Sequence, residues 1–362
     1  MDDFNYGRIR QYYSQGNLGV TAPSQFVKDH GDLLFNLTEM MLRPVFPGTT
    51  AILAVYCKQR LSPKIDEIGL FHKNADSSTP MVIYNMMFLE FTFDLLRFAS
   101  RREPEYFFEI FSKYENTFYG TSKNLSECSQ KHNSDIVFSG IDEEMDLLKK
   151  TAVALLFSIL HECTHAQDDL RSEIRDMFAG NAAFKESVGD FSDDNWTEVA
   201  CDYNALYEIL SHQCHVYEII NKSMSVFSDD IFAMALIMLY AKDLFHWLEY
   251  GLTGSVKTTN KSIDDIGRCI CLDLPKRCQV LAYALQITKN TSNMSMGTLN
   301  IWKAHSYATE LIGDFLRCLG EALHVLGKSS TETIEEQTDN QSVKQDVTED
   351  EIWFRVSLME KE

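Results

Sequence analysis

Residues 147–165 read LLKKTAVALLFSILHECTH, and this stretch decides how the middle of the chain folds. It contains neither glycine nor proline, and the run up to Leu160 is apolar on most sides of a helical wheel. Such a pattern predicts a helix buried in the core. His161, Glu162 and His165 stand at its end, and buried polar groups require partners. We therefore expect these three residues to form part of a site.

The spacing of the two histidines predicts a metal site. An α-helix turns by about 100° per residue, so His161 and His165 project from nearly the same side. Two such imidazoles can bind one zinc ion at about 2.0–2.1 Å. Zinc lowers the pKa of a bound water to about 7, and Glu162 lies where it can take the proton as general base. His-Glu-x-x-His is a metallopeptidase signature. The alternative is a structural helix on which the histidines occur by chance.

A catalytic zinc ion usually has three protein ligands, so a third must come from elsewhere. In metzincins, glycine and histidine follow the second histidine by three and six residues, but Asp168 and Arg171 stand at those positions. Residues 195–206, NWTEVACDYNAL, predict a second helix with Glu198 and Asp202 one turn apart. We predict Glu198 as the third ligand and Asp202 as acceptor of the outer N–H of a zinc-bound imidazole. The alternative is that both are solvated helix charges.

These motifs resemble those of the gluzincins, zinc peptidases in which His-Glu-x-x-His is followed by a ligand glutamate on a later helix. Their second motif often has an aspartate four residues after that glutamate, as Asp202 follows Glu198 here. The resemblance covers about 45 to 60 of the 362 residues, around the two motifs. It implies a zinc peptidase with ligands His161, His165 and Glu198, and with Glu162 as the catalytic residue.

The placement of the motif in mid-chain, after a long helical N-terminal half, also looks like the Lit-type phage-exclusion peptidases of bacteria. Those are cytoplasmic zinc endopeptidases associated with defence against phage, and a translation elongation factor is their known kind of target. The present chain, at 362 residues, looks longer. The resemblance implies a cytoplasmic protein substrate such as a translation factor.

Further side chains near the two motifs are weaker candidates. Cys163 and Cys201 lie inside the motifs and are typical of small buried packing residues, although a thiol beside zinc would make the site sensitive to oxidation. His212 and His215 are spaced for a second metal site, and one of them is an alternative oxyanion donor. The other candidates are Tyr203 and Tyr207 for the oxyanion, and Asp168 and Asp169 as helix-surface or outer-sphere charges.

Composition restricts the partners and the compartment. The chain is 45% hydrophobic and 24% charged, which is ordinary for a globular protein with a large core. Its net charge of −20 argues against non-specific binding to nucleic acid or an anionic membrane, because both need a positive field. Nine scattered cysteines favour reduced thiols in a cytosol.

The N-terminus and the apolar segments also indicate a cytoplasmic protein. The first residues, MDDFNY, lack the apolar core of a signal peptide. The most apolar later run, residues 231–241, is too short to span a bilayer. We therefore expect a protein substrate as partner, and neither nucleic acid nor membrane.

The pattern along the chain predicts a mainly α fold with a small β-sheet, an α+β class with a zincin-like core. Strands are predicted at residues 49–57, 81–88 and 135–141. The last is a candidate edge strand for holding a substrate backbone, the alternative being an internal strand. Residues 170–194 are polar and predict a loop between the two motif helices. Further helices are predicted at residues 24–42, 89–100, 105–115, 209–222, 230–250, 275–287 and 301–326.

We expect four regions. Residues 1–130 form a mostly helical region with a few strands, and residues 131–260 form the zincin-like metallopeptidase core. Residues 261–327 form a C-terminal helical region packed on the core. Residues 328–362 are a polar segment followed by a terminal helix, because residues 328–350 are rich in Ser, Thr, Gln, Glu and Asp.

Two classes of function are compatible with these features. The first is a zinc-dependent endopeptidase that hydrolyses a cytoplasmic protein, with Glu162 as general base. The second is a non-catalytic helical binding or regulatory protein, in which the metal site is structural or absent. A closed structural site needs a fourth protein ligand, whereas a catalytic site leaves one position for water. Glu162 at the catalytic position favours the enzyme, since a structural site has no need of it.

Overall fold

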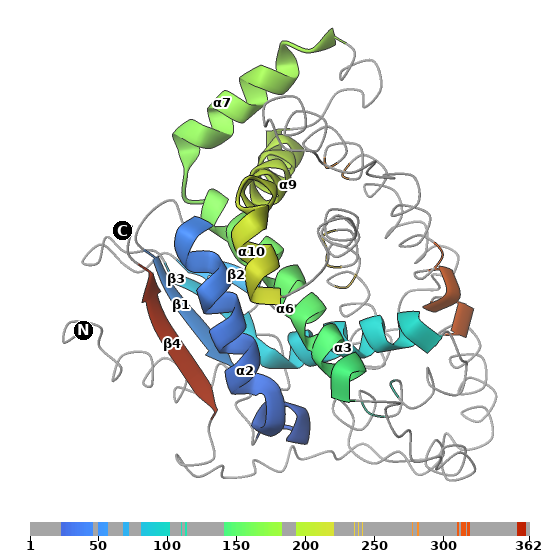
Figure 1. The fold of residues 1–362 in the computed structure, drawn as a ribbon. Coiled ribbons are helices and arrows are strands. Elements are labelled where there is room, and N and C mark those ends of the chain that lie inside the picture. The colour runs from blue at the N-terminus through green and yellow to red at the C-terminus, as the bar shows by residue number, and fades with distance from the viewer. Residues whose placement is uncertain are drawn as a thin grey trace, which may run out of the picture.

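A computed structural model of the chain describes residues 23–45, 50–56, 68–71, 81–101, 141–182, 193–220 and 353–359. It also describes isolated helical positions at residues 110, 113, 235, 238, 241, 277, 281, 310, 313–315, 317 and 318. Within these residues the chain is mainly helical with one small sheet, which confirms the α+β class (Figure 1).

Helix α6 (Ile141–Thr164) is the central element of the fold (Figure 1). Residues 152–157 are buried one after another, so α6 is covered on all sides, as its sequence predicts. Helices α2 (Gln25–Leu42), α3 (Met86–Arg101) and α9 (Asp193–Ser211) pack against it. Burial stabilises each large apolar side chain by roughly 1.5–3 kcal/mol, so this helix is held mainly by packing.

The sheet has four strands in the order β2-β3-β1-β4. They are β1 (Thr50–Val55), β2 (Ile68–Phe71), β3 (Met81–Asn85) and β4 (Phe354–Met359). Strands β1 and β3 are parallel, while β2 runs antiparallel to β3 and β4 antiparallel to β1. β1 and β3 were predicted from sequence, and β2 was not. β2 forms one edge of the described sheet and contacts α6.

The C-terminal strand β4 corrects the prediction of a terminal helix. β4 pairs with β1 in a register that places Phe354 opposite Val55. Its sequence, FRVSLM, alternates apolar and polar residues through Leu358, and a period of two is the signal of a strand. Just before it, Trp353 packs on Gly31 of α2, where a Cβ would lie 2.9 Å from the indole ring. Helix α2 therefore helps to hold the strand at the edge of the sheet.

Side chains define the starts of two helices. The Oγ of Ser24 accepts a hydrogen bond from the amide of Val27 at 3.2 Å, so α2 begins where the sequence predicts. The strand predicted at residues 81–88 is too long, because the side chain of Asn85 accepts from the amide of Met87 at 3.1 Å. That bond supports the start of α3 at the point where β3 ends.

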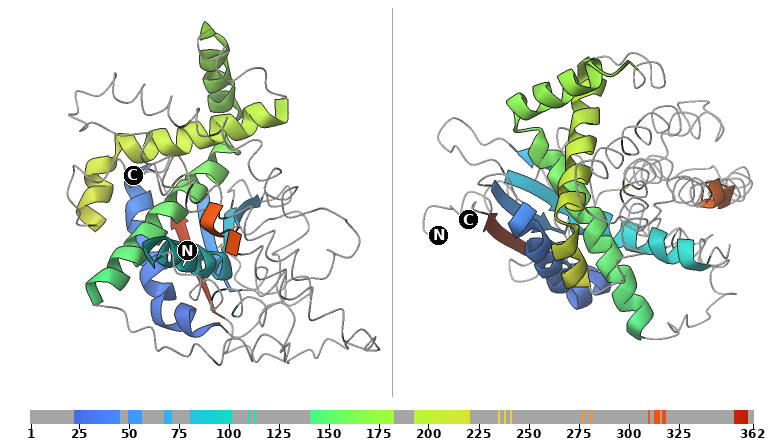
Figure 2. Two further views of the ribbon diagram at one scale, coloured as in Figure 1. Left: turned by 90° about the vertical axis from the view of Figure 1, so that its right-hand side faces the viewer. Right: turned by 45° about the horizontal axis from the view of Figure 1, so that its top comes forward.

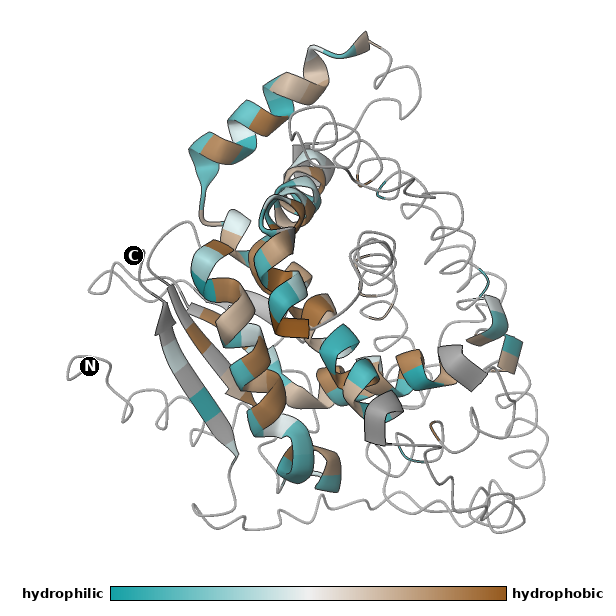
Figure 3. Cartoon of the chain, viewed as in Figure 1, coloured by the Kyte–Doolittle hydropathy of each residue, from teal (hydrophilic) through white to brown (hydrophobic). Residues whose placement is uncertain are grey.

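Helix α7 (Asp168–Ala179) occupies part of the segment predicted as a loop. Ile174 and Phe178 are one turn apart and both buried, and the ring of Phe178 meets Tyr203 of α9 edge-on at 5.2 Å. Figure 3 shows hydrophilic positions on α7 between a few hydrophobic ones. The sequence prediction of a loop was wrong for α7, because the segment is polar and its helix buries only a narrow apolar stripe.

Helix α9 packs across α6 at an oblique angle (Figure 2). The short helix α10 (Gln213–Ile220) follows α9 after a turn at residue 212. The single helix predicted at residues 209–222 is thus divided. The predicted strand at 135–141 lies outside the described residues. The helices predicted at 105–115, 230–250, 275–287 and 301–326 are described only at isolated positions, all helical. Among the described helices, none is long and apolar enough to cross a membrane.

Candidate metal centre

The two histidines of the motif lie at the end of α6. His161 stands in the last turn and is 7% exposed. His165 follows directly after Thr164, the last residue of the helix, and its amide donates to the carbonyl of Glu162 at 3.1 Å. The backbone therefore continues as a turn in the same rotational direction. Both imidazoles still point to one side, as the spacing predicts.

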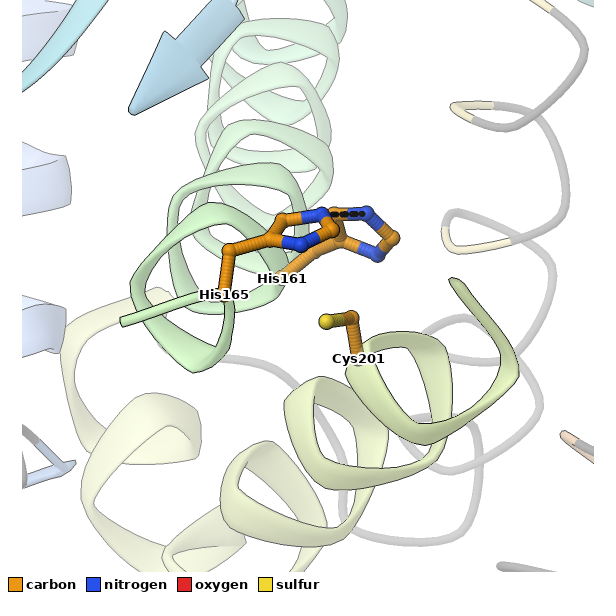
Figure 4. Close-up of side chains that lie close together, drawn as sticks. All are labelled: His161, His165 and Cys201. Carbon is orange, nitrogen blue, oxygen red and sulfur yellow. Dashed lines mark hydrogen bonds between the residues drawn. The ribbon is translucent and has the colours of Figure 1, made fainter. Parts of the chain in front are cut away.

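The imidazoles of His161 and His165 lie against each other (Figure 4). Their Nε2 atoms are 3.2 Å apart, and the ring centroids are 5.0 Å apart with the planes at 71°. Two N–H groups cannot point at each other at this distance, so at least one Nε2 presents its lone pair. The same pair of nitrogens can present two lone pairs to one cation.

Helix α9 brings Glu198 to the same two nitrogens. Its Oε2 is 3.2 Å from Nε2 of His161, and its Oε1 is 3.5 Å from Nε2 of His165. The side chain is 46% exposed, whereas that of His161 is 9% exposed. Glu198 therefore stands on the solvent side of the cluster. The predicted third ligand is within reach of both histidines.

Asp202 binds the other ring nitrogen of His161, Nδ1. The Nδ1 of His161 donates to Oδ1 of Asp202 at 2.8 Å, and the aspartate is fully buried. Arg277 binds the same carboxylate in a bidentate manner: Nε donates to Oδ2 at 2.6 Å and Nη2 to Oδ1 at 2.9 Å. With Nδ1 as the donor, Nε2 of His161 carries the lone pair whenever the ring is neutral.

Sequence reasoning did not identify Arg277. The signal that was present is general: a fully buried carboxylate such as Asp202 is almost always paired with a cation. That rule does not say which cation, and Arg277 comes 75 positions later in the sequence. Nη2 of Arg277 also lies 3.9 Å from Oε2 of Glu198, so the arginine faces both carboxylates of α9.

A further buried hydrogen bond sets how α6 and α9 lie against each other. Nδ2 of Asn204 on α9 donates to Oγ1 of Thr164 at 3.0 Å. That hydroxyl donates in turn to the carbonyl of Leu160 at 2.8 Å. Together with the bond between His161 and Asp202, this contact fixes the register of the two helices. Neutral buried bonds of this kind contribute about 0.5–1.5 kcal/mol each.

The charged groups around His161 shift one another's pKa values. Burial by itself would lower the pKa of His161, but its hydrogen bonds to Asp202 and Glu198 outweigh burial and raise the pKa to about 9. Burial would raise the pKa of Glu198, yet the hydrogen bond and charge of His161 bring it to about 2. The pKa of Asp202 also falls to about 2, because Arg277 and His161 outweigh burial. The cluster thus favours a positive charge at the position of His161 Nε2.

The distances fit a tetrahedral metal ion. Ligand atoms bound at about 2.0–2.1 Å with tetrahedral angles lie about 3.3–3.5 Å from one another. The three separations among Nε2 of His161, Nε2 of His165 and the Glu198 oxygens are 3.2, 3.2 and 3.5 Å. Two imidazoles and one carboxylate are also a donor set that zinc takes in catalytic sites. These residues therefore fit a divalent metal of this class.

Glu162, the predicted general base, belongs to the same electrostatic environment. It follows His161 directly in α6 and is half-buried. Its negative charge is among the causes that raise the pKa of His161 and of Cys201. Glu162 therefore lies within electrostatic range of His161 and Cys201.

A fourth side chain with a metal-binding atom lies at the cluster. One donor atom each of His161, His165 and Cys201 lie within 4.8 Å of one another. Figure 4 shows the side chain of Cys201 reaching from α9 toward the imidazoles of α6. Glu198 has the shorter measured separations from the ring nitrogens, so it remains the better third ligand.

Other candidates named from the sequence have contacts of their own. His212 places Nδ1 3.0 Å from the carbonyl of Glu208, and His215 places Nε2 3.1 Å from the carbonyl of Met40. The two histidines belong to no metal-binding group within the described residues. Tyr203 packs against Tyr207, with ring centroids 6.0 Å apart.

The aspartates after the motif lie at the start of α7. The side chain of Asp168 is 88% exposed and pairs with Arg171. Asp169 stands beside it in the first turn, where negative charge favours the helix. This arrangement agrees with the reading of Asp168 and Asp169 as helix-surface charges.

Comparison with known proteins gives no match, whether to a protein-family model, to a curated protein or to a solved structure. The resemblance to gluzincins and to Lit-type peptidases thus stays a prediction from the residues of the two motifs. The geometry of the α6 and α9 side chains is the independent observation.

Proposed function

We propose that the chain is a zinc-dependent endopeptidase of the gluzincin type, with a zincin-like core built on α6 and α9. The proposal assigns His161, His165 and Glu198 as metal ligands. The observation that carries it is the convergence of three donor groups from two helices at 3.2, 3.2 and 3.5 Å. Those spacings match a tetrahedral coordination face, with the fourth position open for water.

Asp202 and Arg277 hold the ligands in place. Asp202 accepts from Nδ1 of His161, which fixes the tautomer that offers Nε2 and makes the ring more basic. The bidentate contact from Arg277 neutralises Asp202, so that the buried aspartate does not require a proton. Each link in this chain is a hydrogen bond of normal length.

Glu162 is assigned as general base. Bound zinc supplies Lewis acidity that makes a water molecule acidic near neutral pH and polarises a carbonyl group. Glu162 takes the proton of the attacking water and then returns it to the leaving amine, so one carboxylate acts first as base and then as acid. Helical geometry puts Glu162 about 60° around the axis from His165, and the effect of its charge on the pKa of His161 supports this assignment.

The substrate class that we propose is an extended segment of a protein. Strand β2 lies at an edge of the described sheet and contacts α6, whose end carries the motif. A sheet edge offers unpaired N–H and C=O groups that bind an extended peptide by β-strand addition. β2 would thereby take the role for which residues 135–141 were one candidate.

The resemblance to Lit-type peptidases leads us to propose further that the substrate is a cytoplasmic protein, such as a translation factor, in a bacterial defence against phage. This part rests on the motif and its mid-chain position alone. A proteomic comparison of cells that make the wild type or Glu162→Gln tests it. We expect new peptide ends from one target only with the wild type, and equal peptide patterns would contradict a cellular protease function.

The direct test of the chemistry is Glu162→Gln in the purified chain. This isosteric change removes the base and keeps the ligands, so zinc content measured by elemental analysis should equal that of the wild type. Turnover of the target identified in cells should fall by about 10²–10⁴-fold, the usual contribution of a general base. Cleavage at the wild-type rate would remove Glu162 from its assigned role. Loss of zinc would instead mean that Glu162 is structural.

A second candidate function is a non-catalytic binding or regulatory protein with a structural metal. One observation favours it: Cys201 lies near both histidines, and a closed structural site needs a fourth protein ligand. In that case Glu162→Gln would change neither metal content nor any cellular cleavage. The same pair of experiments therefore separates the two functions.

A further inference from the structure

We propose that Cys201 is a fourth protein ligand of the same metal. The resting site would then be closed by His161, His165, Glu198 and Cys201, and would open to an outside ligand only when the sulfur leaves. This inference rests on the metal site of the proposed function. It adds to that function a way to hold the site inactive.

The placement of Cys201 on α9 carries the argument. Cys201 follows Glu198 by three positions, and residues three apart project from the same face of a helix. Both side chains therefore face α6, which packs along α9. The sulfur lies within 4.8 Å of a ring nitrogen of both His161 and His165. Two facing helices thus supply two donors each.

The sulfur can reach a metal without rearrangement of the backbone. A tetrahedral ion bound at about 2.0–2.1 Å to nitrogen and about 2.3 Å to sulfur places these donors about 3.6 Å apart. The present separations are no more than 4.8 Å, so a shift of roughly 1 Å suffices. A rotation of about 35° about χ1, the one torsion of a cysteine side chain, moves its sulfur by about 1 Å.

A thiolate at this position would leave the net charge around the metal the same as a bound hydroxide would. The thiol proton leaves to solvent as the sulfur–metal bond forms, and the sulfur takes the position that water would otherwise occupy. A thiolate carries one negative charge, the same as the hydroxide that the chemistry requires there. The reverse exchange takes up one proton and one water. A thiolate is also a soft ligand, so a site that contains it prefers zinc or a similar ion over magnesium and calcium.

Cys163 provides a matched control. It lies in the first motif and is buried, as Cys201 is. It follows His161 by two positions, which is about 200° around α6, so its sulfur cannot point to the same side as the two imidazoles. A substitution at Cys163 therefore reports what the loss of any buried thiol does to the protein.

The test uses the full chain, stripped of metal and loaded with Co²⁺. Tetrahedral Co²⁺ gives strong visible bands, and a sulfur ligand adds a charge-transfer band in the near ultraviolet. We expect both in the wild type and in Cys163→Ala. We expect only the visible bands in Cys201→Ala, with zinc affinity at least about tenfold lower, since even the loss of an outer-sphere partner costs this much.

The outcomes separate the two proposals. Visible bands without the near-ultraviolet band in the wild type would overturn the ligand role of Cys201 and leave the peptidase site intact. No Co²⁺ binding by the wild type would overturn both. The wild-type spectrum decides this point even where Cys201→Ala does not fold.

Azide tests whether the site is closed. It binds metal positions that are open or held by water, so it should change the visible bands of Cys201→Ala while leaving those of the wild type unchanged. An equal change in both proteins would contradict a closed resting site.

Discussion

Two buried helices of this chain carry a glutamate and an aspartate four residues apart, and their surroundings differ. One pair is Glu90 and Asp94 on α3, and the other is Glu198 and Asp202 on α9. At the first pair, both side chains are nearly inaccessible, at 3% and 8% exposed. At the second, Asp202 is inaccessible and Glu198 is 46% exposed. Equal spacing along the sequence thus occurs in two kinds of site.

The α3 pair is satisfied by an amine and a hydroxyl. Nζ of Lys113 lies 2.7 Å from Oε1 of Glu90 and 2.5 Å from Oδ2 of Asp94. Ser24, which caps α2, donates to Oε2 of Glu90 at 2.7 Å. A lysine has three donors and no lone pair for a metal. This arrangement joins α2, α3 and the segment around Lys113, and its role is structural.

The α9 pair is satisfied by groups that themselves can bind a metal. Glu198 faces the Nε2 atoms of His161 and His165, and Asp202 faces Nδ1 of His161. The pKa values differ accordingly. Burial raises the pKa of Glu90 in spite of Lys113, whereas His161 and its neighbours outweigh burial and lower the pKa of Glu198 to about 2. The partner, and not the spacing of the carboxylates, therefore distinguishes the candidate metal centre from an ion pair with a lysine.

The largest expected effect is that of replacing Glu198 with glutamine, and the same replacement at Glu90 is its comparison. Glu198→Gln removes a proposed ligand, so zinc affinity should fall by at least about 100-fold, the upper end of what loss of an outer-sphere partner does. Glu90→Gln should leave zinc affinity unchanged. Competition with a chromophoric chelator measures both values. If the two variants bind zinc equally well, Glu198 is not a ligand.

Glu90→Gln should instead lower the stability of the protein. The change removes a charged acceptor from a buried network, so the free energy of unfolding of the metal-free chain should fall by about 1–3 kcal/mol. Denaturant unfolding followed by circular dichroism measures this loss.

The aspartates allow the same comparison at a smaller scale. Asp202→Asn leaves a hydrogen-bonding side chain of the same shape but weakens the hold on His161. Zinc affinity should fall by about 10–100-fold, as is usual for the outer partner of a metal-bound imidazole. Asp94→Asn should not change it. An effect of Asp94→Asn as large as that of Asp202→Asn would mean that both act only through stability.

Arg277→Lys should have a smaller effect. A lysine keeps the positive charge beside Asp202 but cannot make the two parallel hydrogen bonds of a guanidinium. We expect zinc affinity to fall by no more than about tenfold, because the charge on Asp202 remains balanced and only its orientation is loosened. The same chelator competition measures it. A loss greater than that of Asp202→Asn would assign Arg277 a direct contact with the bound species.

The smallest expected signal is the release of one proton by His161 when zinc binds, which is separate from the proton that Cys201 loses if its sulfur also binds the metal. The pKa of His161 is raised to about 9 in the metal-free chain, so this ring is protonated at pH 7.5 and must lose a proton to offer Nε2. The release should decline as the pH rises through about 9, since the proton is then already absent. Calorimetry in buffers of different ionisation enthalpy counts the protons. Asp202→Asn should reduce the release and Asp94→Asn should not, and a release that is independent of pH would contradict this origin.

Much of the site could be predicted because its parts are local. The buried character of α6 and the spacing of His161 and His165 follow from helical periodicity, and the same holds for Glu198 and Asp202. The start of α2 at its N-cap, Ser24, could also be predicted, because a capping side chain binds an amide only three positions away. The strand β4 carried a signal of period two that the prediction of a terminal helix overlooked.

Other features could not be read from short windows. Strand β2 has only four residues, and α7 buries two apolar side chains within a polar segment. Arg277 reaches Asp202 across 75 positions, and nothing in the residues around 277 indicates that partner. The pairing of β4 with β1 joins residues about 300 positions apart, which depends on the path of the whole chain.

The sequence alone determined that α6 is a buried helix with two imidazoles and a carboxylate at its end, because side-chain direction along a helix follows from backbone geometry. The sequence also predicted that Glu198 and Asp202 meet those imidazoles, but only the tertiary structure showed this contact and showed that Arg277 and Cys201 join it. The reason is physical: periodicity acts over a few residues, whereas the meeting of α6, α9 and residue 277 depends on how buried surfaces pack. The same packing gave Glu90 and Asp94 a lysine instead.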